Sequence, residues 1–502
     1  MLMNKKIVSG YPLIINYLGI FSVLVGLILL LPLAVIPFYS EEVVHMKEFL
    51  IPSISSILVG AIIIMIFKGR EKGRLERSQD AILVVFIWIL AISLSAIPFV
   101  LTGKYNFTQA IFESTSGYST TGLTVVDVTV TPHIFLLYRS LLQFFGGVGL
   151  VLVLTSAISD KFGMRLYSAE GHSDKLVPNL IKSGRIILSI YVGYILVGMV
   201  VYMLFKMPAF DALNHSISAL ATGGFSTQAG SIGTYNSVGI EVTTMILMLL
   251  GGTNFFVHLY LLSGRLKNVV AHVEMKLLAI LLLIFIPLLT IDLVVANHLS
   301  FGESLRISSF QFISAITGTG YQTVSSFDTI LLTPAFLSIL IIAMVLGAGM
   351  GSTAGGMKQY RVALAFKSIW WNIKEQLSHH KTIRTRFINR IGTRTIVSKD
   401  EIVQNHSFLM VYILTLILGT LIFTFYGFSI TDSLFEFSSA LGTVGLSVGI
   451  TGFGAPNAIL WTSTIGMFLG RLEFYVIFVA IARIGNDLKP TNKKPMKTVK
   501  AA

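Results

Sequence analysis

Four short segments of this chain repeat a pattern of serine, threonine and glycine whose oxygen atoms could bind a cation. When the segments are aligned without gaps on one glycine each, serine stands six residues before that glycine in all four. The aligned glycines are Gly122, Gly224, Gly320 and Gly445, and the serines are Ser116, Ser218, Ser314 and Ser439. Glycine adopts positive φ without a Cβ clash, so it lets a turn direct carbonyl oxygens toward one point. Carbonyl and hydroxyl oxygens are hard ligands that suit alkali cations rather than transition metals.

The recurrence has a simpler explanation, because serine, threonine and glycine are also common in surface turns. Four unrelated turns would share this composition without sharing the same offsets. Here the residue five before the glycine is small in each segment, and the residue after it is large and apolar or aromatic. We therefore interpret the segments as parts of an internal repeat.

The composition places these segments in a membrane protein. Hydrophobic residues make up 54% of the 502 residues and charged residues 12%, and the mean hydropathy is +0.79. A chain with so few charges does not cover a soluble core of this size. The chain contains no cysteine, which excludes disulfides, thiolate metal sites and cysteine catalysis.

A transmembrane helix needs roughly 20 mostly apolar residues to cross about 30 Å of hydrocarbon. Ten stretches meet this requirement: 13–38, 49–67, 81–101, 133–157, 184–205, 237–262, 276–297, 333–357, 405–427 and 457–483. The first follows Lys5 and Lys6 but is too long for a signal peptide and lacks a convincing cleavage site, so we interpret it as a helix. Each of the four turns lies between two of the last eight spans, after an apolar segment too short to cross.

Lysine and arginine fall mostly in alternate connections between the spans. Residues 1–12, 68–80, 158–185, 263–276, 358–404 and 483–502 hold 31 of the 37. Cytoplasmic loops of membrane proteins carry this excess, so we expect both termini in the cytoplasm. The net charge of +13 then reflects topology rather than binding to nucleic acid. Docking of a regulatory subunit or of anionic lipid is the alternative reason for the basic residues of 358–404.

These observations predict an all-α polytopic membrane protein. An N-terminal pair of transmembrane helices at 1–79 precedes four repeats of span, re-entrant pore helix and span around a pore, at 80–183, 184–275, 276–404 and 405–502. Non-helical backbone survives at membrane depth only if it is buried or lines a watery path. Each re-entrant helix enters from outside and ends at its turn, so its partially negative C-terminus favours a cation there. We therefore expect a cation filter.

The pore segments STTGLT, ATGGFST, TGTGYQT and GTVGLSV, together with LGAGMGSTAGGMK and FLGRLEF, resemble the bacterial TrkH/KtrB superfamily of potassium transport proteins. The resemblance covers about residues 80–485, and the additional N-terminal pair is more similar to the TrkH branch. It implies transport of K⁺ through a channel-like pore in each subunit, and a homodimer in the lipid of the plasma (inner) membrane. It also implies gating by a cytosolic nucleotide-binding regulatory ring of the RCK type, with no organic cofactor in this chain.

The resemblance assigns the filter by position. It places the filter at Thr120, Thr121 and Gly122, at Thr222, Gly223 and Gly224, at Gly318, Thr319 and Gly320, and at Thr443, Val444 and Gly445. The third repeat has Gly318 where the other repeats have threonine. We therefore expect the ring of ligands at that level to depart from fourfold symmetry.

Two features below the filter predict a gate. Glycines crowd residues 347–356, namely Gly347, Gly349, Gly351, Gly355 and Gly356, and each costs about 1 kcal/mol relative to alanine in a helix. We expect the eighth span to break there, although close helix packing through small residues is an alternative. Arg471 lies deep in the last span, at an offset of 26 from Gly445, against 27 for Gly347 from Gly320. A fixed positive charge beside the path would oppose a cation, unless Arg471 only forms a structural ion pair with Glu473 or another acid.

Other polar residues of the repeats have weaker interpretations. Glu113, His215, Gln311 and Glu436 occupy equivalent positions in the re-entrant segments. The two glutamates would either concentrate cations at the outer mouth or serve as solvated or capping residues. Arg139 and Arg306 are expected to extend to the membrane interface, as long basic side chains near span ends usually do.

Two other classes of function are alternatives to a channel-like pore. A secondary transporter that couples potassium to protons or sodium would show broken helices in two halves and buried carboxylates for the coupling ion. A membrane enzyme would need a catalytic constellation, and the sequence contains no H-E-x-x-H, G-x-S-x-G or phosphate-binding loop. The sequence therefore predicts no enzyme and favours the pore.

Overall fold

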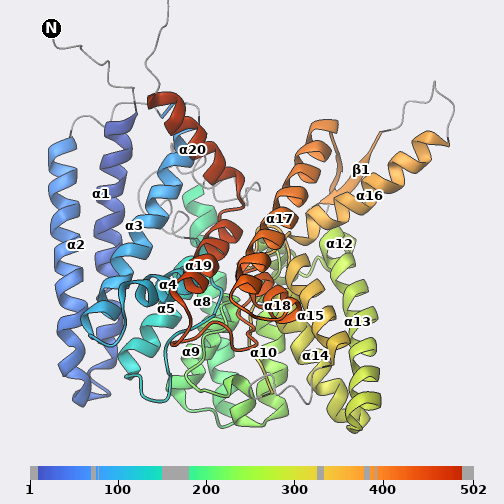
Figure 1. Cartoon of the computed structure of the whole chain (residues 1–502), viewed down its shortest axis with the longest axis horizontal. Coiled ribbons are helices and arrows are strands. Elements are labelled where there is room, and N and C mark those ends of the chain that lie inside the picture. The colour runs from blue at the N-terminus through green and yellow to red at the C-terminus, as the bar shows by residue number, and fades with distance from the viewer. Residues whose placement is uncertain are drawn as a thin grey trace, which may run out of the picture.

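The computed structural model describes residues 10–68, 75–76, 78–149, 180–324, 333–377, 385–390 and 393–488. In these residues the regular structure is helical except for one two-stranded hairpin (Figure 1). Six of the described helices are long and apolar enough to cross a membrane, and eight spans result if each of two bent helix pairs counts as one. The remaining two predicted spans, 133–157 and 333–357, correspond to shorter helices, α5 (His133–Val148) and α15 (Pro334–Leu346). The predicted all-α polytopic membrane fold is confirmed.

The N-terminal pair consists of α1 (Tyr11–Ile28) and α2 (Met46–Phe67), joined through the 3₁₀ turns η1 (Leu31–Val35) and η2 (Ser40–His45). Glycines let the two helices approach closely, since a Cβ on Gly60 would lie 2.5 Å from the Gly19 carbonyl oxygen. Hydroxyl groups add cross-links, with Ser53 Oγ donating to Gly26 O at 2.7 Å. The pair packs against repeat one at the left of Figure 1.

The four repeats have the predicted order of span, re-entrant helix and span. Repeat one has α3 (Gln79–Leu101), α4 (Phe107–Tyr118) and α5 (His133–Val148); repeat two has α8 (Leu180–Leu204), α9 (Ala209–Leu220) and α10 (Val238–Gly251); repeat three has α13 (Val273–Asn297), α14 (Phe301–Thr317) and α15 (Pro334–Leu346); and repeat four has α17 (Lys399–Phe425), α18 (Ile430–Leu441) and α19 (Asn457–Arg471). The re-entrant helices α4, α9 and α18 have 12 residues each and α14 has 17. At about 1.5 Å per residue, none of the four crosses the hydrocarbon layer.

Local sequence fixes where the re-entrant helices begin. Asn106 and Gln109 form a capping box at the start of α4, each side chain accepting from the other residue's backbone N–H. Ser300 and Ser429 cap α14 and α18 by accepting from the backbone N–H three residues later. Pro208 stands at the N-cap of α9. The short helices are therefore encoded separately from the spans that surround them.

Two of the predicted spans are broken rather than continuous, which corrects the sequence interpretation. The stretch 237–262 divides into α10 and α11 (Phe255–Leu262), which meet at 114°. The break follows two glycines, and the side chain of Asn254 caps α11 by accepting from Phe256 N at 2.9 Å. The stretch 457–483 divides into α19 and α20 (Tyr475–Leu488), which meet at 97°. Glu473 and Phe474 make that corner with φ of 56° and 55°.

The eighth span ends where the glycines predict. Helix α15 stops at Leu346, and residues 347–358, called here the α15–α16 loop, run without regular helix to α16 (Gln359–Gln376). Lys358, which the charge count placed in a cytoplasmic loop, is only 5% exposed. The predicted basic connection 358–404 also holds structure that the sequence did not foretell, namely α16 and the antiparallel pair β1 (Phe387–Arg390) and β2 (Thr393–Ile396).

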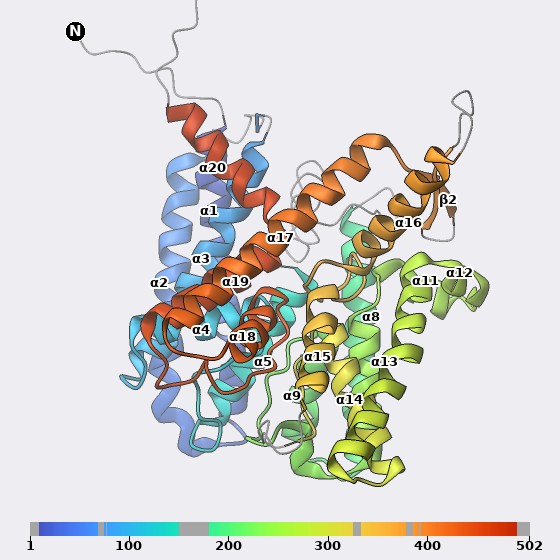
Figure 2. The same cartoon turned by 45° about the vertical axis from the view of Figure 1, so that its right-hand side comes forward.

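The start of α1 and the end of α20 lie at the same end of the molecule, at the top of Figure 1. The Tyr11 hydroxyl donates to Asp487 Oδ2 at 3.0 Å, which joins the two. Helix α16 and the hairpin project at this end too, beside the short helix α12 (Leu266–Ala271), as Figure 2 shows. Lys5, Lys6, the tail after 488, the end of the span 133–157 and most of the basic segment 158–185 lie outside the described residues.

The charge distribution predicts that the end with α16 faces the cytoplasm. Because the chain has no cysteine, single cysteines report orientation without background. Val130 is 68% exposed before α5, and Leu377 is 82% exposed after α16. In intact cells, a membrane-impermeant maleimide should label Val130→Cys, whereas Leu377→Cys should react only after permeabilisation. Labelling in the reverse order would overturn the topology.

Candidate ion pathway

The four aligned glycines form a closed ring, in which each one packs against a carbonyl group of the next repeat. A Cβ atom built on any of the four glycines would lie only 2.0 to 2.2 Å from a carbonyl oxygen of the next repeat. The pairs are Gly122 with Gly223 O at 2.2 Å, Gly224 with Thr319 O at 2.0 Å, Gly320 with Val444 O at 2.0 Å, and Gly445 with Thr121 O at 2.1 Å. The contacts run from repeat one through two, three and four and back to one. The four turns therefore surround a single axis, and no larger residue fits at these positions.

The backbone of the four turns follows one pattern. At the first and third filter positions φ is positive in every repeat: 56° and 91° at Thr120 and Gly122, 50° and 75° at Thr222 and Gly224, 70° and 80° at Gly318 and Gly320, and 50° and 97° at Thr443 and Gly445. Such alternation lets successive carbonyl oxygens face the same axis, as in filters of backbone oxygens. Positive φ is rare for a β-branched residue, so the fold must impose it on the three threonines.

Gly318 therefore departs from its counterparts in side chain but not in backbone. It adopts the same positive φ as the three threonines, and it does so without the Cβ strain. The expected asymmetry at this level concerns one missing hydroxyl group. The carbonyl groups keep the fourfold pattern.

The serines that mark the repeat anchor the turns. In each repeat the serine carbonyl accepts from the backbone N–H of the second filter residue, at 2.8 to 3.0 Å, in Thr121, Gly223, Thr319 and Val444. In repeats one and four the serine hydroxyl also accepts from the filter glycine, with Ser116 Oγ 3.1 Å from Gly122 N and Ser439 Oγ 3.0 Å from Gly445 N. In these two repeats the re-entrant helix and its turn are thus joined at two points.

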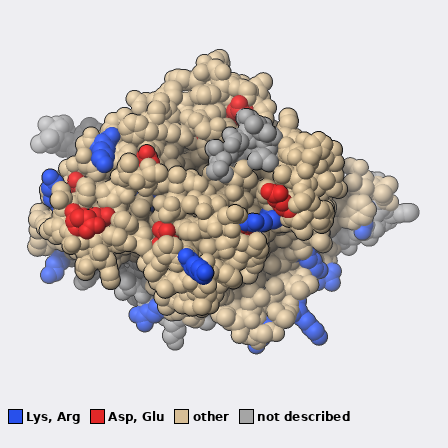
Figure 3. Space-filling view, turned by 90° about the horizontal axis from the view of Figure 1, so that it is seen from below, with Lys and Arg blue, Asp and Glu red and all other residues tan. Residues whose placement is uncertain are grey.

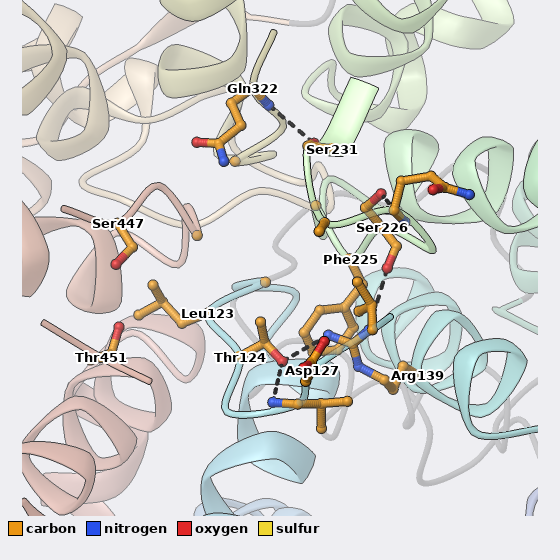
Figure 4. A pocket seen from close by; sticks show the side chains of 18 residues that line it. Leu123, Thr124, Asp127, Arg139, Phe225, Ser226, Ser231, Gln322, Ser447 and Thr451 are labelled. Carbon is orange, nitrogen blue, oxygen red and sulfur yellow. Dashed lines mark hydrogen bonds between the residues drawn. The ribbon is translucent and has the colours of Figure 1, made fainter. Parts of the chain in front are cut away.

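A cavity of about 300 Å³, called here the outer cavity, opens on the side of the ring that the charge distribution predicts to be external. The four filter glycines lie among its lining residues, with Asp127, Gln322 and Ser447 around them, as Figure 4 shows. Asp127 is exposed, and hydrogen bonds from the side chain and backbone of Thr129 lower the pKa of its carboxyl group. Seen from this face, charged side chains are scattered over a mostly uncharged surface (Figure 3).

Glu113 and Glu436 do not face this cavity as exposed charges. Both are buried, and each binds the extended segment that follows its own filter turn. Glu113 accepts from Val125 N at 3.0 Å, and Glu436 accepts from Val448 N at 2.9 Å. The capping interpretation therefore fits them better than cation concentration at the mouth, because their oxygens are already hydrogen-bonded.

Arg139 does not extend to the interface, so that expectation was wrong. It is 1% exposed and its Nε donates to Glu113 Oε1 at 2.7 Å. A guanidinium group buried at this depth needs a charged partner, which Glu113 supplies. Arg306 also forms an ion pair, with Glu241 at 2.6 Å, but its side chain is partly exposed. His215, the counterpart of Glu113 in repeat two, is buried 3.0 Å from Ser226 Oγ.

The tip of the α15–α16 loop lies against the first filter position of all four repeats. Thr120 Oγ1 donates to Thr353 O at 3.3 Å, and the hydroxyls of Thr222 and Thr353 are 2.9 Å apart. A Cβ on Gly355 would lie 2.1 Å from Thr443 Oγ1, and one on Gly318 would lie 3.7 Å from Ala354 Cβ. The loop thus covers the inner end of the ring, opposite the outer cavity.

Arg471 holds this loop tip. It is the last residue of α19, and its Nη1 donates to Thr353 O at 2.5 Å. Its Nη2 donates to the carbonyl oxygens of Gly146 and Gly147 at the end of α5. Glu473, the partner in the alternative interpretation, forms its ion pair with Arg361. The sequence placed Arg471 and the loop at similar depth, and in the structure the two are in direct contact.

The rest of the loop is docked on the break between α10 and α11. Gly349 N donates to Gly252 O at 2.9 Å, and Asn254 Nδ2 donates to Met350 O at 2.5 Å. Met350 N donates to Glu274 Oε1 at 2.8 Å. Sequence reasoning missed Asn254, Glu274 and Thr353, although a carboxylate at the start of an apolar span was a visible signal for Glu274.

The chain is similar to known cation transport proteins. Residues 45–487 match the model of the TrkH family, described as a cation transport protein. The chain is 32% identical over 429 residues to the Trk system potassium uptake protein TrkH of Salmonella typhimurium, covering 82% of this chain and 86% of that protein. It is 30% identical over 492 residues to the Trk system potassium uptake protein TrkG of Escherichia coli, covering 94% and 98%.

A solved structure has the same fold. The crystal structure of the potassium transporter TrkH from Vibrio parahaemolyticus superposes with a TM-score of 0.83 and 23% sequence identity, over 95% of this chain and 100% of that one. The closed ring of four repeats, the family match over most of the length and the curated relatives lead to one conclusion: this chain belongs to the TrkH family of cation transport proteins.

Proposed function

We propose that this chain carries potassium ions across the plasma membrane of a bacterium through the pore that its four repeats enclose. The observation that carries the proposal is the closed ring of carbonyl contacts around Gly122, Gly224, Gly320 and Gly445. Backbone oxygens arranged around one axis replace the hydration shell of an alkali cation without using a charged side chain. The related proteins from Salmonella typhimurium and Escherichia coli are named as potassium uptake proteins, which supports the choice of ion.

The pore has the parts that a stepwise path for a cation needs. Ions would enter the outer cavity, where Asp127 supplies a negative charge. They would then pass the ring of carbonyl groups at the filter positions, from Thr120 to Gly122 and in the three equivalent turns. Each re-entrant helix ends at this ring, so four partially negative helix termini favour a cation there.

The α15–α16 loop and Arg471 form the proposed gate. Thr353 connects them, since it contacts two filter threonines and accepts a hydrogen bond from Arg471. A loop in this position blocks the inner end of the ring by its volume. Arg471 adds a positive charge, which at an effective dielectric constant of about 20 opposes a cation 4 Å away by about 4 kcal/mol. Opening requires the loop tip to leave both contacts.

We further propose that the protein works as a homodimer whose gate is controlled by a cytosolic nucleotide-binding ring of the RCK type. The family resemblance supports both partners. The end that projects α16 and the hairpin is the surface offered to the ring, and Trp370 and Leu377 are exposed there. Both termini would be cytoplasmic in the inner membrane, because lysine and arginine are concentrated in the connections that the sequence predicts to be cytoplasmic.

Rubidium flux into liposomes tests the transport proposal. Purified protein should take up rubidium down its own gradient, without any sodium or proton gradient, because a channel-like pore needs no coupling ion. Uptake that appears only when a sodium or proton gradient is imposed would replace the pore with an ion-coupled secondary transporter. Absence of uptake under both conditions, with the regulatory ring added, would contradict potassium transport.

Substitution of a ring glycine tests the filter. In Gly445→Ser, the added Cβ would lie 2.1 Å from Thr121 O, so the carbonyl ring must shift. The preference for rubidium over sodium should fall by about tenfold or more, the ratio that corresponds to losing about 1.4 kcal/mol of differential binding. Gly122→Ser should behave in the same way. Gly454→Ser is the matched control, because a Cβ there meets nothing within 4 Å. An unchanged preference in both filter variants would refute the assignment.

Removal of the gate residues tests whether Arg471 and the α15–α16 loop block the ion path or only stabilise the fold. Arg471→Ala, and separately a deletion within residues 350–354, should raise rubidium flux per folded molecule and leave the ion preference unchanged. Neither variant removes a filter residue, so the ion preference should be kept. Arg483→Ala serves as the control, because Arg483 pairs with Glu76 and Asp487, away from the ring. A lower yield of folded protein with unchanged flux per folded molecule would mean that Arg471 only stabilises the fold, and it would exclude the gate.

A further inference from the structure

Gln143 is a buried polar residue in the second span of repeat one, and its side chain binds the filter turn of repeat two. Its Nε2 donates to Gly223 O at 2.5 Å, which is one of the four carbonyl groups of the ring. Its Oε1 accepts from Ser218 Oγ at 2.6 Å and from Phe225 N at 3.3 Å. Each amide atom thus meets a group of the opposite hydrogen-bonding character, which fixes the orientation of the amide.

Packing of the second spans shows which residues are equivalent to Gln143. A Cβ on Gly146, Gly251 or Gly470 would lie 2.0 to 2.3 Å from the carbonyl oxygen of the residue four before the filter glycine, which is Tyr118, Leu220 or Leu441. These glycines therefore occupy one position in α5, α10 and α19. Three residues earlier stand Gln143, Met248 and Met467. Among these three spans, only α5 brings an amide to the filter.

This amide replaces a bond that two other repeats make internally. In repeats one and four the serine hydroxyl accepts from the filter glycine of the same repeat. In repeat two the Ser218 hydroxyl donates to Gln143 instead, and Gln143 reaches the residues on both sides of Gly224. The filter turn of repeat two is therefore held by a side chain from repeat one.

Arg139 strengthens the same link from one helical turn away. It lies four residues before Gln143, so both side chains project from one face of α5. Its guanidinium carbon lies 3.9 Å from the centre of the Phe225 ring, and its Nη2 donates to Thr124 Oγ1 at 2.9 Å. Figure 4 shows Arg139 beside Thr124 and Phe225, which belong to the segments that leave the filter turns of repeats one and two. Helix α5 thus clamps two neighbouring turns from outside the ring.

We propose that Gln143 is a positioning residue that determines ion specificity by orienting the Gly223 carbonyl group. A hydrogen bond on one ring oxygen draws that carbonyl toward α5 and restrains its distance from the axis. The ring then resists contracting around a smaller cation, so rubidium and potassium are preferred over sodium. The inference rests on the proposed potassium pore and names one side chain that sets its selectivity.

Two variants separate this role from simple packing. Gln143→Met gives α5 the residue that α10 and α19 carry at this position, and it removes the donor to Gly223 O. Gln143→Glu keeps the shape and the acceptor for Ser218 and Phe225, but places a carboxylate oxygen against Gly223 O. Both should lower the preference for rubidium over sodium by about tenfold, the ratio expected from loss of one buried hydrogen bond. Met467→Leu, at the equivalent position of repeat four, should leave the preference unchanged.

The measurement is rubidium uptake into liposomes in competition with sodium, with folded yield recorded separately. If the unsubstituted protein takes up rubidium in preference to sodium and both Gln143 variants match it, the inference is wrong while the pore stands. If the unsubstituted protein shows no such preference, the proposed function fails first. If Gln143→Met folds poorly, Gln143→Glu decides the question, since a purely structural role would leave its preference unchanged.

Discussion

The structure depends on one constraint, which is that unpaired backbone groups inside a membrane need partners. Four turns with alternating positive φ place carbonyl groups around an axis where lipid could not satisfy them. The ring closes because each filter glycine packs within van der Waals reach of the next repeat's carbonyl group. A side chain at any of these glycines would push that ring apart. The short re-entrant helices, the anchoring serines and the enclosing spans all serve to hold this arrangement.

Support for the ring is unequal among the repeats, although the backbone pattern is fourfold. In repeats one and four, buried carboxylates, Glu113 and Glu436, bind the segment that follows the filter turn. Repeat two has His215 at that position and relies on Gln143 from the preceding repeat. Four copies on a single chain can diverge in this way, whereas four identical subunits cannot. The side chains that support the filter turns can therefore differ from one repeat to the next.

The inner end of the pathway is built from irregular segments of three repeats. The α15–α16 loop rests on the break between α10 and α11, and Arg471 reaches it from the corner between α19 and α20. Each of these spans is interrupted at about the same depth below the ring. Interrupted helices leave backbone groups without partners in their own helix, and side chains such as Asn254 and Arg471 bond those of the loop.

Much of this protein can be read from the sequence because membranes impose simple rules. Span length and the recurrence of serine six residues before each glycine predicted the fold, the repeat and the four glycines that meet around one axis. The glycines of 347–356 also marked the broken span, since glycine is unfavourable in a helix. These features are local in sequence, and a periodic pattern makes them visible.

Tertiary structure alone decided what the remaining polar residues do. The sequence suggested an interfacial arginine for Arg139 and an outer-mouth carboxylate for Glu113. In the structure the two form a buried ion pair at 2.7 Å. Gln143, Asn254 and Glu274 each bind a segment far away in the chain, so no spacing rule could identify their partners. The spans 237–262 and 457–483 read as continuous because hydropathy measures composition, whereas their corners depend on backbone angles that the neighbouring loop stabilises. Sequence thus determined which residues form the ring, and the fold determined what holds and closes it, because the ring is a local repeat and its supports are long-range contacts.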